Sequence, residues 1–212
     1  MKQMIRILIA DDHAVVRKGL RQIITDEFPS AEITEVGDVE SLIVQVIRAD
    51  WDVIICDISM PGRSGVEALE QIKQIKPDIP VLMLSMHSED QYAMRVLKAG
   101  ASGFLNKSSV HEELIKAIHM VRLGRRYITS SIAERLAESL SDHNGKHPHE
   151  LLSNREFEIL KLIASGRSIS EIADQLSLSP TTVSTYRSRI LEKMSMKSNA
   201  DITRYAIEKG LI

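Results

Sequence analysis

The first 123 residues alternate short apolar runs with longer amphipathic stretches, and this alternation most constrains what the chain can fold into. Five apolar runs have the length and composition of strands, at residues 4–10, 32–37, 52–57, 81–85 and 102–106. Helical spacing follows each run, at residues 13–27, 39–49, 65–76, 89–99 and 110–123. Five successive βα units imply a parallel sheet with helices on both faces. We therefore expect an α/β doubly wound, five-stranded parallel sheet.

Residues 151–212 follow a different pattern, because no segment among them favours a strand. Four helices are expected, and each has a start signal: Ser153 with Glu156, Ser168 with Glu171, Ser179 before Pro180, and Ser198 with Asp201. Between the two patterns, residues 124–150 hold one candidate helix, IAERLAESL, and then a polar segment with Gly and Pro that is typical of a linker. We therefore expect a domain at 1–123, a linker at 124–150 and a separate all-α domain at 151–212.

Composition narrows the class of protein. Cys56 is the single cysteine, so no internal disulfide is expected, and a reducing, cytoplasmic setting is favoured. The chain has no apolar run of about 18 residues, so no membrane partner is expected, and the N-terminus indicates a first strand rather than a signal peptide. Residues 150–212 carry nine Lys or Arg against eight Asp or Glu, a balance too even to indicate nucleic acid by itself.

Polar side chains stand where the expected strands end. Asp11 and Asp12 follow the first strand, Asp57 ends the third, Ser85 ends the fourth, and Lys107 follows the fifth. In a doubly wound sheet, ligands bind outside the carboxyl ends of the strands. Three close carboxylates repel one another, and Mg²⁺, which prefers carboxylate oxygens and water, relieves such repulsion. The pattern therefore predicts a Mg²⁺ site at this edge.

Asp57 is the carboxylate best placed to react. A strand-end carboxylate that contacts the metal and faces outward can attack phosphorus and form an aspartyl phosphate. Mg²⁺ and Lys107 would then offset the charge on the phosphoryl oxygens. Taken singly, each residue has an ordinary alternative, since a strand-end acid is usually solvated and Asp11 with Asp12 could cap the next helix. Their joint placement favours the reactive site.

Four segments, IADDH, DISMPGRSG, LMLSMH and GFLNKSS, resemble the receiver domain of bacterial two-component response regulators. The resemblance covers residues 4 to about 123 and implies a flavodoxin-like fold. It implies that Asp57 is the phosphoacceptor and Lys107 the phosphate-binding lysine. Ser85 would be the switch hydroxyl, and Phe104 the switch aromatic.

The same resemblance implies a metal site and a mechanism for the switch. Mg²⁺ would be held by Asp11, Asp12 and the backbone carbonyl of Ser59 beside the phosphoacceptor, in part through water. A phosphoryl group adds charge and acceptor oxygens, and Ser85 can donate to one of them. Moving Ser85 inward would vacate space for Phe104 and change the surface around the fourth and fifth helices. Ordinary core packing is the alternative role for Phe104.

The segment SISEIADQLSLSPTTVSTYRSRILEKM has the spacing of two helices joined by a short turn. Val183, Ile190 and Met194 give the second helix an apolar face. Its opposite face carries small polar and basic side chains: Thr182, Ser184, Thr185, Ser188, Arg189 and Lys193. Small polar residues allow close approach to base edges in the major groove, and basic residues suit phosphates. Taken alone, such a helix pair more often belongs to a helical bundle.

Residues 151–212 resemble the LuxR-type four-helix DNA-binding domain nearly end to end. With the receiver, the whole chain is similar to the NarL/FixJ-family response regulators, and TVSTYRSRILEKM looks closest to the branch that holds BvgA, EvgA and FimZ. The resemblance assigns the last helix, residues 199–209, to dimerisation on DNA. The positions that it implies at DNA are Ser184, Thr185 and Ser188 at the bases and Arg187, Arg189 and Lys193 mainly at the backbone.

The two sites together predict a phosphorylation-controlled transcription regulator and not an enzyme. A sensor histidine kinase would phosphorylate Asp57, and the chain would bind double-stranded DNA as a homodimer, through the receiver, the C-terminal helix or both. RNA polymerase is a further candidate partner. Two alternatives stay open: a Mg²⁺-dependent phosphotransferase or phosphatase for small molecules, and a DNA binder or protein adaptor that does not depend on phosphorylation. The enzyme is disfavoured because no extra domain or long loop is expected over the site.

Overall fold

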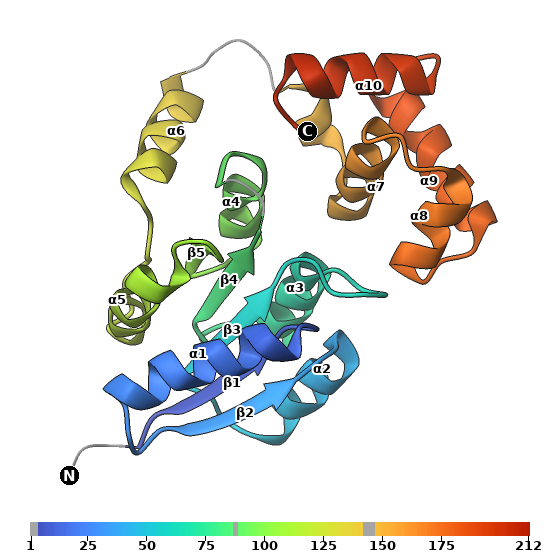
Figure 1. Ribbon diagram of the computed structural model, residues 1–212. Helices are drawn as coiled ribbons and strands as arrows, with labels where there is room; N and C mark the ends of the chain where they lie inside the picture. Colours follow the sequence, from blue (N-terminus) through green and yellow to red (C-terminus); the bar gives the residue numbers. More distant parts are fainter. Residues whose placement is uncertain (1–3, 87–88, 142–146) are drawn as a thin grey trace. The chain divides into compact units, whose positions relative to one another are not determined.

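The computed structural model describes residues 4–86, 89–141 and 147–212 (Figure 1). The chain forms two compact units, Met1–Leu140 and Ser141–Ile212, and each buries its own apolar side chains. Among the described residues, no helix is both long enough and apolar enough to cross a membrane.

A five-stranded parallel sheet forms the centre of the N-terminal unit, in the order β2-β1-β3-β4-β5. The strands are β1 (Arg6–Ala10), β2 (Glu32–Val36), β3 (Val53–Asp57), β4 (Val81–Ser85) and β5 (Gly103–Asn106). Every neighbouring pair is parallel. All residues of β3 and β4 are buried, as expected for central strands that are covered on both faces. The predicted sheet is therefore confirmed.

Helices follow the strands and cover both faces of the sheet (Figure 1). They are α1 (Ala14–Glu27), α2 (Val39–Arg48), α3 (Gly65–Ile75), α4 (Glu89–Lys98) and α5 (Val110–Arg122). α1 contacts α5, and α2 contacts α3. Alternate residues of a strand face opposite sides, so Ile7 and Ile9 of β1 pack with α1 and α5 while Leu8 faces the other helix layer.

The core of this unit reaches past residue 123, where we expected the domain to end. Tyr127 is only 6% exposed and belongs to the apolar cluster under α1 and α5. Its backbone N–H donates to the carbonyl of Ser102 at 2.8 Å, and it forms a parallel β-bridge with Gly103. A Cβ at Gly103 would lie 2.9 Å from the Tyr127 carbonyl oxygen, so this close approach requires glycine. The chain leaving α5 is thus fixed to the edge strand.

Residues 124–150, expected to form a linker with one helix, contain α6 (Ser130–Ser141) and most of a short 3-10 helix, η1 (Pro148–Leu151). Ile132 of α6 is 1% exposed. Residues 142–146 of the expected linker lie outside the described part of the chain.

Within the described residues 147–212, four α-helices follow η1, as predicted: α7 (Asn154–Ala164), α8 (Ile169–Leu176), α9 (Pro180–Lys193) and α10 (Asn199–Glu208). Each begins after the predicted serine, whose hydroxyl accepts a backbone N–H from the first turn. α7 packs against α9 and α10, and α8 against α9. Ser177 ends α8 in the left-handed conformation (φ 52°) and so turns the chain toward α9.

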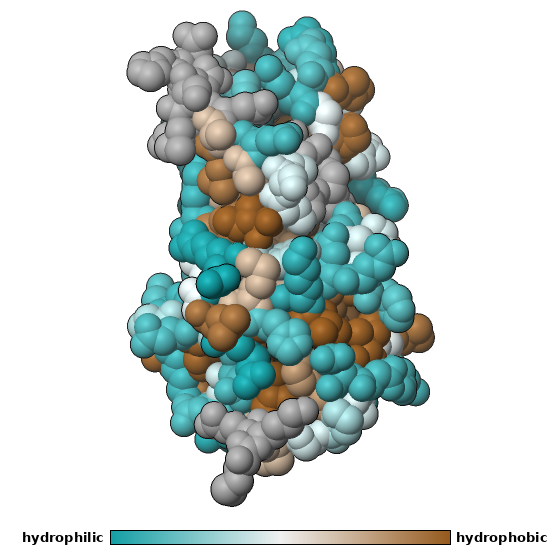
Figure 2. All heavy atoms as spheres, turned by 90° about the vertical axis from the view of Figure 1, so that its left-hand side faces the viewer, coloured by the Kyte–Doolittle hydropathy of each residue, from teal (hydrophilic) through white to brown (hydrophobic). Residues whose placement is uncertain are grey.

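Most large apolar side chains of the described residues lie inside these cores, although Val15, Met86 and Leu123 are well exposed. Figure 2 shows one face of the molecule, on which polar side chains separate apolar ones into small groups.

Candidate functional site

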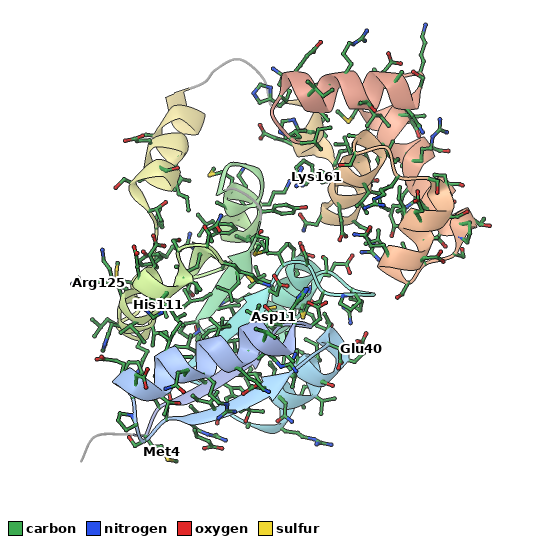
Figure 3. All side chains as sticks on the ribbon, viewed as in Figure 1. Met4, Asp11, Glu40, His111, Arg125 and Lys161 are labelled. Atoms are coloured by element: carbon green, nitrogen blue, oxygen red, sulfur yellow. The ribbon has the colours of Figure 1, made fainter. Side chains whose placement is uncertain are left out.

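The carboxyl edge of the sheet brings together three predicted residues from three strands. Asp11 follows β1, Asp57 ends β3, and Lys107 follows β5. Lys107 Nζ lies 2.7 Å from Oδ2 of Asp11 and 2.9 Å from Oδ2 of Asp57. The side chain of Lys107 is 6% exposed, that of Asp11 is 0% exposed and that of Asp57 is 2% exposed, so both contacts are buried. Figure 3 marks Asp11 at this edge, beside the start of α1.

The acidic cluster at this edge contains four residues. Asp11, Asp12, His13 and Asp57 each offer one ligand atom, and these atoms all lie within 4.8 Å of one another. His13 Nδ1 is 2.8 Å from Oδ1 of Asp12 and 3.4 Å from Oδ1 of Asp11. Sequence reasoning gave His13 no role, although the string DDH places it directly after the two acids.

This donor set fits a hard divalent cation. Carboxylate oxygens are the ligands that Mg²⁺ prefers, and three carboxylates lie close enough to share one ion. Both oxygens of Asp11 already have partners, because Oδ1 accepts the backbone N–H of His13 at 2.8 Å and Oδ2 contacts Lys107. Asp12 is the more open of the two acids after β1, with 29% of its side chain exposed.

Burial sets the electrostatics of the pair formed by Asp57 and Lys107. Burial, helped by the charge of Asp11, raises the pKa of Asp57 to about 6, although Lys107 and the backbone N–H of Ser59 act in the opposite direction. Burial also opposes the charge on Lys107, but hydrogen bonds to Asp11 and Asp57 outweigh it, and the pKa of Lys107 is raised. The site therefore holds a charged ammonium beside a carboxylate whose negative charge is poorly solvated.

The two predicted switch residues lie in the neighbouring strands. Ser85 ends β4 and is fully buried, and its carbonyl accepts the backbone N–H of Lys107 at 2.8 Å. Phe104 in β5 is fully buried and pairs with Met83 of β4. Ser59, predicted at the metal, is exposed two residues beyond β3.

Two residues that sequence reasoning missed also shape the site. Gly65 begins α3 so close to β3 that a Cβ there would lie 1.8 Å from the backbone oxygen of Asp57. Its N–H donates to the carbonyl of Ile58 at 2.8 Å. Arg17 of α1 donates to the backbone carbonyl of Asp11 at 2.6 Å. The glycine in PGRSG was a usable signal, whereas Arg17 looks like any polar residue on a helix surface.

In the C-terminal unit, α9 turns the predicted DNA-facing residues outward. Val183 and Ile190 are fully buried, which fixes the opposite face of the helix toward solvent. The predicted residues that are exposed on that face are Ser184, Thr185, Ser188, Arg189 and Lys193. Thr182 is partly buried, and its hydroxyl pairs with that of Ser179, the N-cap, at 2.8 Å.

Two of the predicted cations on α9 have partners within the same unit. Lys193 Nζ lies 2.7 Å from Oε2 of Glu156 on α7, and that glutamate side chain is only 3% exposed. Arg187 donates from Nε to Oδ1 of Asn199 at the start of α10. Arg189 is exposed and lies over the ring of Tyr186, 5.9 Å from its centroid. Arg189 is therefore the more available cation on this face.

Comparison with known proteins places both units in described families. Residues 7–119 match the response regulator receiver domain, and residues 150–206 match the bacterial regulatory proteins of the luxR family. The response regulator UvrY of Escherichia coli is 36% identical over 209 residues, which cover 98% of this chain and 96% of UvrY. The response regulator GacA of Pseudomonas aeruginosa is 35% identical over 210 residues, which cover 99% and 98%.

Solved structures of the RcsB response regulator are similar along the whole chain. One from Salmonella typhimurium has a TM-score of 0.70 and 26% identity, and the match covers 97% of this chain and 98% of that one. The structure of an RcsB–DNA complex has a TM-score of 0.59 and 26% identity, with 96% and 98% covered.

Proposed function

This chain belongs to the two-component response regulators that join a receiver domain to a LuxR-type DNA-binding domain, and on that premise we propose how its residues act. Members of this family, of which UvrY and GacA are relatives in the NarL/FixJ group, regulate transcription by binding DNA in response to phosphorylation. The observation that carries the residue assignments is the buried contact of Lys107 with both Asp11 and Asp57.

Asp57 is the proposed phosphoacceptor. One of its oxygens attacks the phosphorus of a phosphohistidine on a sensor histidine kinase, the P–N bond breaks, and an aspartyl phosphate forms. Its poorly solvated carboxylate, with a pKa raised to about 6, is largely ionised at neutral pH and therefore available as a nucleophile. Lys107 lies 2.9 Å from it and is placed to offset charge on the phosphoryl oxygens.

Mg²⁺ is the proposed cofactor at Asp11, Asp12, Asp57 and the backbone carbonyl of Ser59. When bound, it supplies positive charge beside the transferred phosphoryl group. Asp12 and Asp57 are the proposed direct ligands, because both oxygens of Asp11 are already engaged, by the His13 N–H and by Lys107. Asp11 would then contact the ion through a water molecule and would also hold Lys107 in place.

Ser85 and Phe104 are the proposed switch. Ser85 stands at the carboxyl end of β4, joined to Lys107 by a backbone hydrogen bond of 2.8 Å. A phosphoryl group on Asp57 would offer an acceptor for the Ser85 hydroxyl. Phe104 pairs with Met83 and Asn106 pairs with Ser85, so Ser85 and the buried Phe104 lie diagonally on one face of neighbouring strands. A movement of Ser85 would therefore change the space open to the Phe104 ring. The change would reach the surface through β5 and the helices on either side of it.

Double-stranded DNA is the proposed target of the C-terminal unit. Ser184, Thr185 and Ser188 are small and exposed on α9, so they can approach base edges in the major groove. Arg187 and Arg189 are proposed at phosphates, and Lys193 also, once released from Glu156. The RcsB–DNA complex supports this proposal by similarity.

Residues 1–123 are the proposed receiver, residues 124–150 the proposed linker, and residues 151–212 the proposed DNA-binding domain. Tyr127, within the proposed linker, packs into the core of the receiver. A homodimer is proposed, through the receiver, α10 or both, and one RcsB structure contains dimers bound to DNA. The remaining proposed partners are a sensor histidine kinase and RNA polymerase. The proposed location is the cytoplasm, where such a regulator can meet both the sensor histidine kinase and RNA polymerase.

The test combines phosphorylation with DNA binding. Purified protein is incubated with acetyl phosphate and Mg²⁺, and the site of modification is mapped by mass spectrometry. We expect one stable phosphoryl group at Asp57 that Asp57→Asn abolishes and Asp26→Asn does not, together with tighter, salt-dependent DNA binding in a genome-wide footprint. Rapid multiple-turnover release of phosphate would favour the enzyme alternative. DNA binding that phosphorylation leaves unchanged would favour the phosphorylation-independent alternative.

A further inference from the structure

His13 is the one member of the acidic cluster that the proposed phosphotransfer does not use. Its backbone is fixed, because it is the N-cap residue of α1 and its N–H donates to Oδ1 of Asp11 at 2.8 Å. N-cap residues usually accept a hydrogen bond from the first turn through a short polar side chain, but the His13 side chain makes no such bond. Its imidazole points instead at the carboxylates.

The imidazole lies where a cation shared by Asp12 and Asp57 would meet it. His13 Nδ1 is 2.8 Å from Oδ1 of Asp12, and a ring nitrogen of His13 is among the four ligand atoms that lie within 4.8 Å of one another. Its side chain is 64% exposed, so it stands on the solvent side of a site whose inner side is closed by Lys107 and Asp11. A cation at the site could therefore take two carboxylate oxygens from the inside and one ring nitrogen from the rim.

A nitrogen donor changes which ions the site favours. Mg²⁺ selects oxygen ligands, keeps several of its waters and gains little from imidazole. Mn²⁺ and Co²⁺ accept imidazole together with carboxylates, and the preference for nitrogen increases from Mn²⁺ to Co²⁺. We infer that His13 is a metal ligand that gives this receiver a preference for transition ions over Mg²⁺ at the Asp12–Asp57 site. This inference rests on the proposed metal site of the receiver.

The direct test is electron spin echo envelope modulation spectroscopy of the full chain loaded with Mn²⁺, which detects coupling to a coordinated imidazole nitrogen. The coupling should be present in the wild type and absent in His13→Asn, which keeps a polar N-cap residue. His119→Asn is the matched control, because His119 is a half-exposed histidine of the same unit that pairs with Glu27 and not with the acidic cluster. The chain has seven histidines, so this control is needed.

Calorimetric titration gives the selectivity. For His13→Asn we expect Co²⁺ and Mn²⁺ affinities to fall by about tenfold, with the larger loss for Co²⁺, and Mg²⁺ affinity to stay within about twofold of the wild type. A parallel fall for all three ions would overturn the inference, since it would mean that His13 only positions Asp12. Nitrogen coupling that survives in His13→Asn would overturn it as well. His13→Gln, compared by circular dichroism and melting temperature, guards against a folding defect in one variant.

Failure of this inference is distinguishable from failure of the proposed function. Acetyl phosphate with Mg²⁺ should modify Asp57 of the wild-type chain whether or not nitrogen coupling is seen, because the proposed phosphotransfer uses the three carboxylates and Lys107. If that modification persists while nitrogen coupling is absent from the wild type, only the role of His13 is wrong.

Discussion

Replacing Asp57 by asparagine removes a charge that the folded receiver solvates poorly, so the substitution should stabilise the metal-free protein at neutral pH. Burial, with the charge of Asp11, raises the pKa of Asp57 from 3.8 to about 6 in spite of Lys107. A carboxyl group with a raised pKa in the folded state favours folding at pH values below its unfolded-state pKa. It loses that contribution as the pH rises through the folded-state pKa.

The size of the effect follows from the difference between the two pKa values. Roughly two pH units correspond to about 3 kcal/mol, since each unit is worth about 1.4 kcal/mol. Asparagine cannot ionise, so Asp57→Asn should exceed the wild type in free energy of unfolding by about 2 to 3 kcal/mol at pH 8 in EDTA. The difference should shrink between pH 6 and pH 4. Mg²⁺ should reduce it at pH 8, because the ion binds the ionised carboxylate of the wild type.

Urea unfolding at a series of pH values measures this difference. Trp51, the single tryptophan, is buried in the N-terminal unit, so its fluorescence reports on the receiver alone. Asp26→Asn, at an exposed position of α1, is the control for removing one negative charge. The electrostatic account of the site would be wrong if Asp57→Asn were less stable than the wild type at pH 8. It would also be wrong if the free energies of unfolding of Asp57→Asn and the wild type changed equally with pH.

Four further substitutions separate the roles of other residues. Lys107→Met should lower the free energy of unfolding by about 3 kcal/mol, because it leaves two buried carboxylates without their cation, and Asp57→Asn in the same chain should restore part of the loss. Gly65→Ala should destabilise the receiver by at least about 2 kcal/mol and slow its phosphorylation, since the new Cβ would overlap the β3 backbone. Gly19→Ala is the comparison for thermal melts and phosphorylation rates, because Gly19 lies in α1 with no atom within 4 Å of its Cβ position and without a positive φ. Lys193→Ala should lower the free energy of unfolding of the C-terminal unit by about 1 kcal/mol, because it removes the contact with Glu156. Arg189→Ala should leave that free energy unchanged and should reduce the salt dependence of DNA binding by about one phosphate contact. If Lys193→Ala and Arg189→Ala changed stability and DNA binding to the same extent, the conclusion that Arg189 is the more available cation would be wrong.

Several features could be predicted from the sequence because they depend on neighbours along the chain. Strand and helix patterns repeat every few residues, and the four serine caps act within one helical turn. The meeting of Asp11, Asp57 and Lys107 was also predictable, although these residues are far apart in sequence. Parallel strands place their carboxyl ends at one edge, so strand assignment alone brings these residues to the same place. The narrower resemblance to the BvgA, EvgA and FimZ branch stays a prediction.

Other features were decided only by the tertiary structure. Whether Lys193 reaches Glu156 depends on how α7 and α9 pack, and whether the His13 ring faces the acids depends on a side-chain rotation that spacing does not set. The attachment of Tyr127 to β5 depends likewise on a backbone approach that only Gly103 permits. The sequence by itself determined which residues reach the carboxyl edge, because its pattern marks where each strand ends and all strands of a parallel sheet end at the same edge. The structure alone decided their partners, since contacts of 2.7 to 2.9 Å such as those of Lys193 and Lys107 require atoms from separate elements to be placed within a fraction of an ångström.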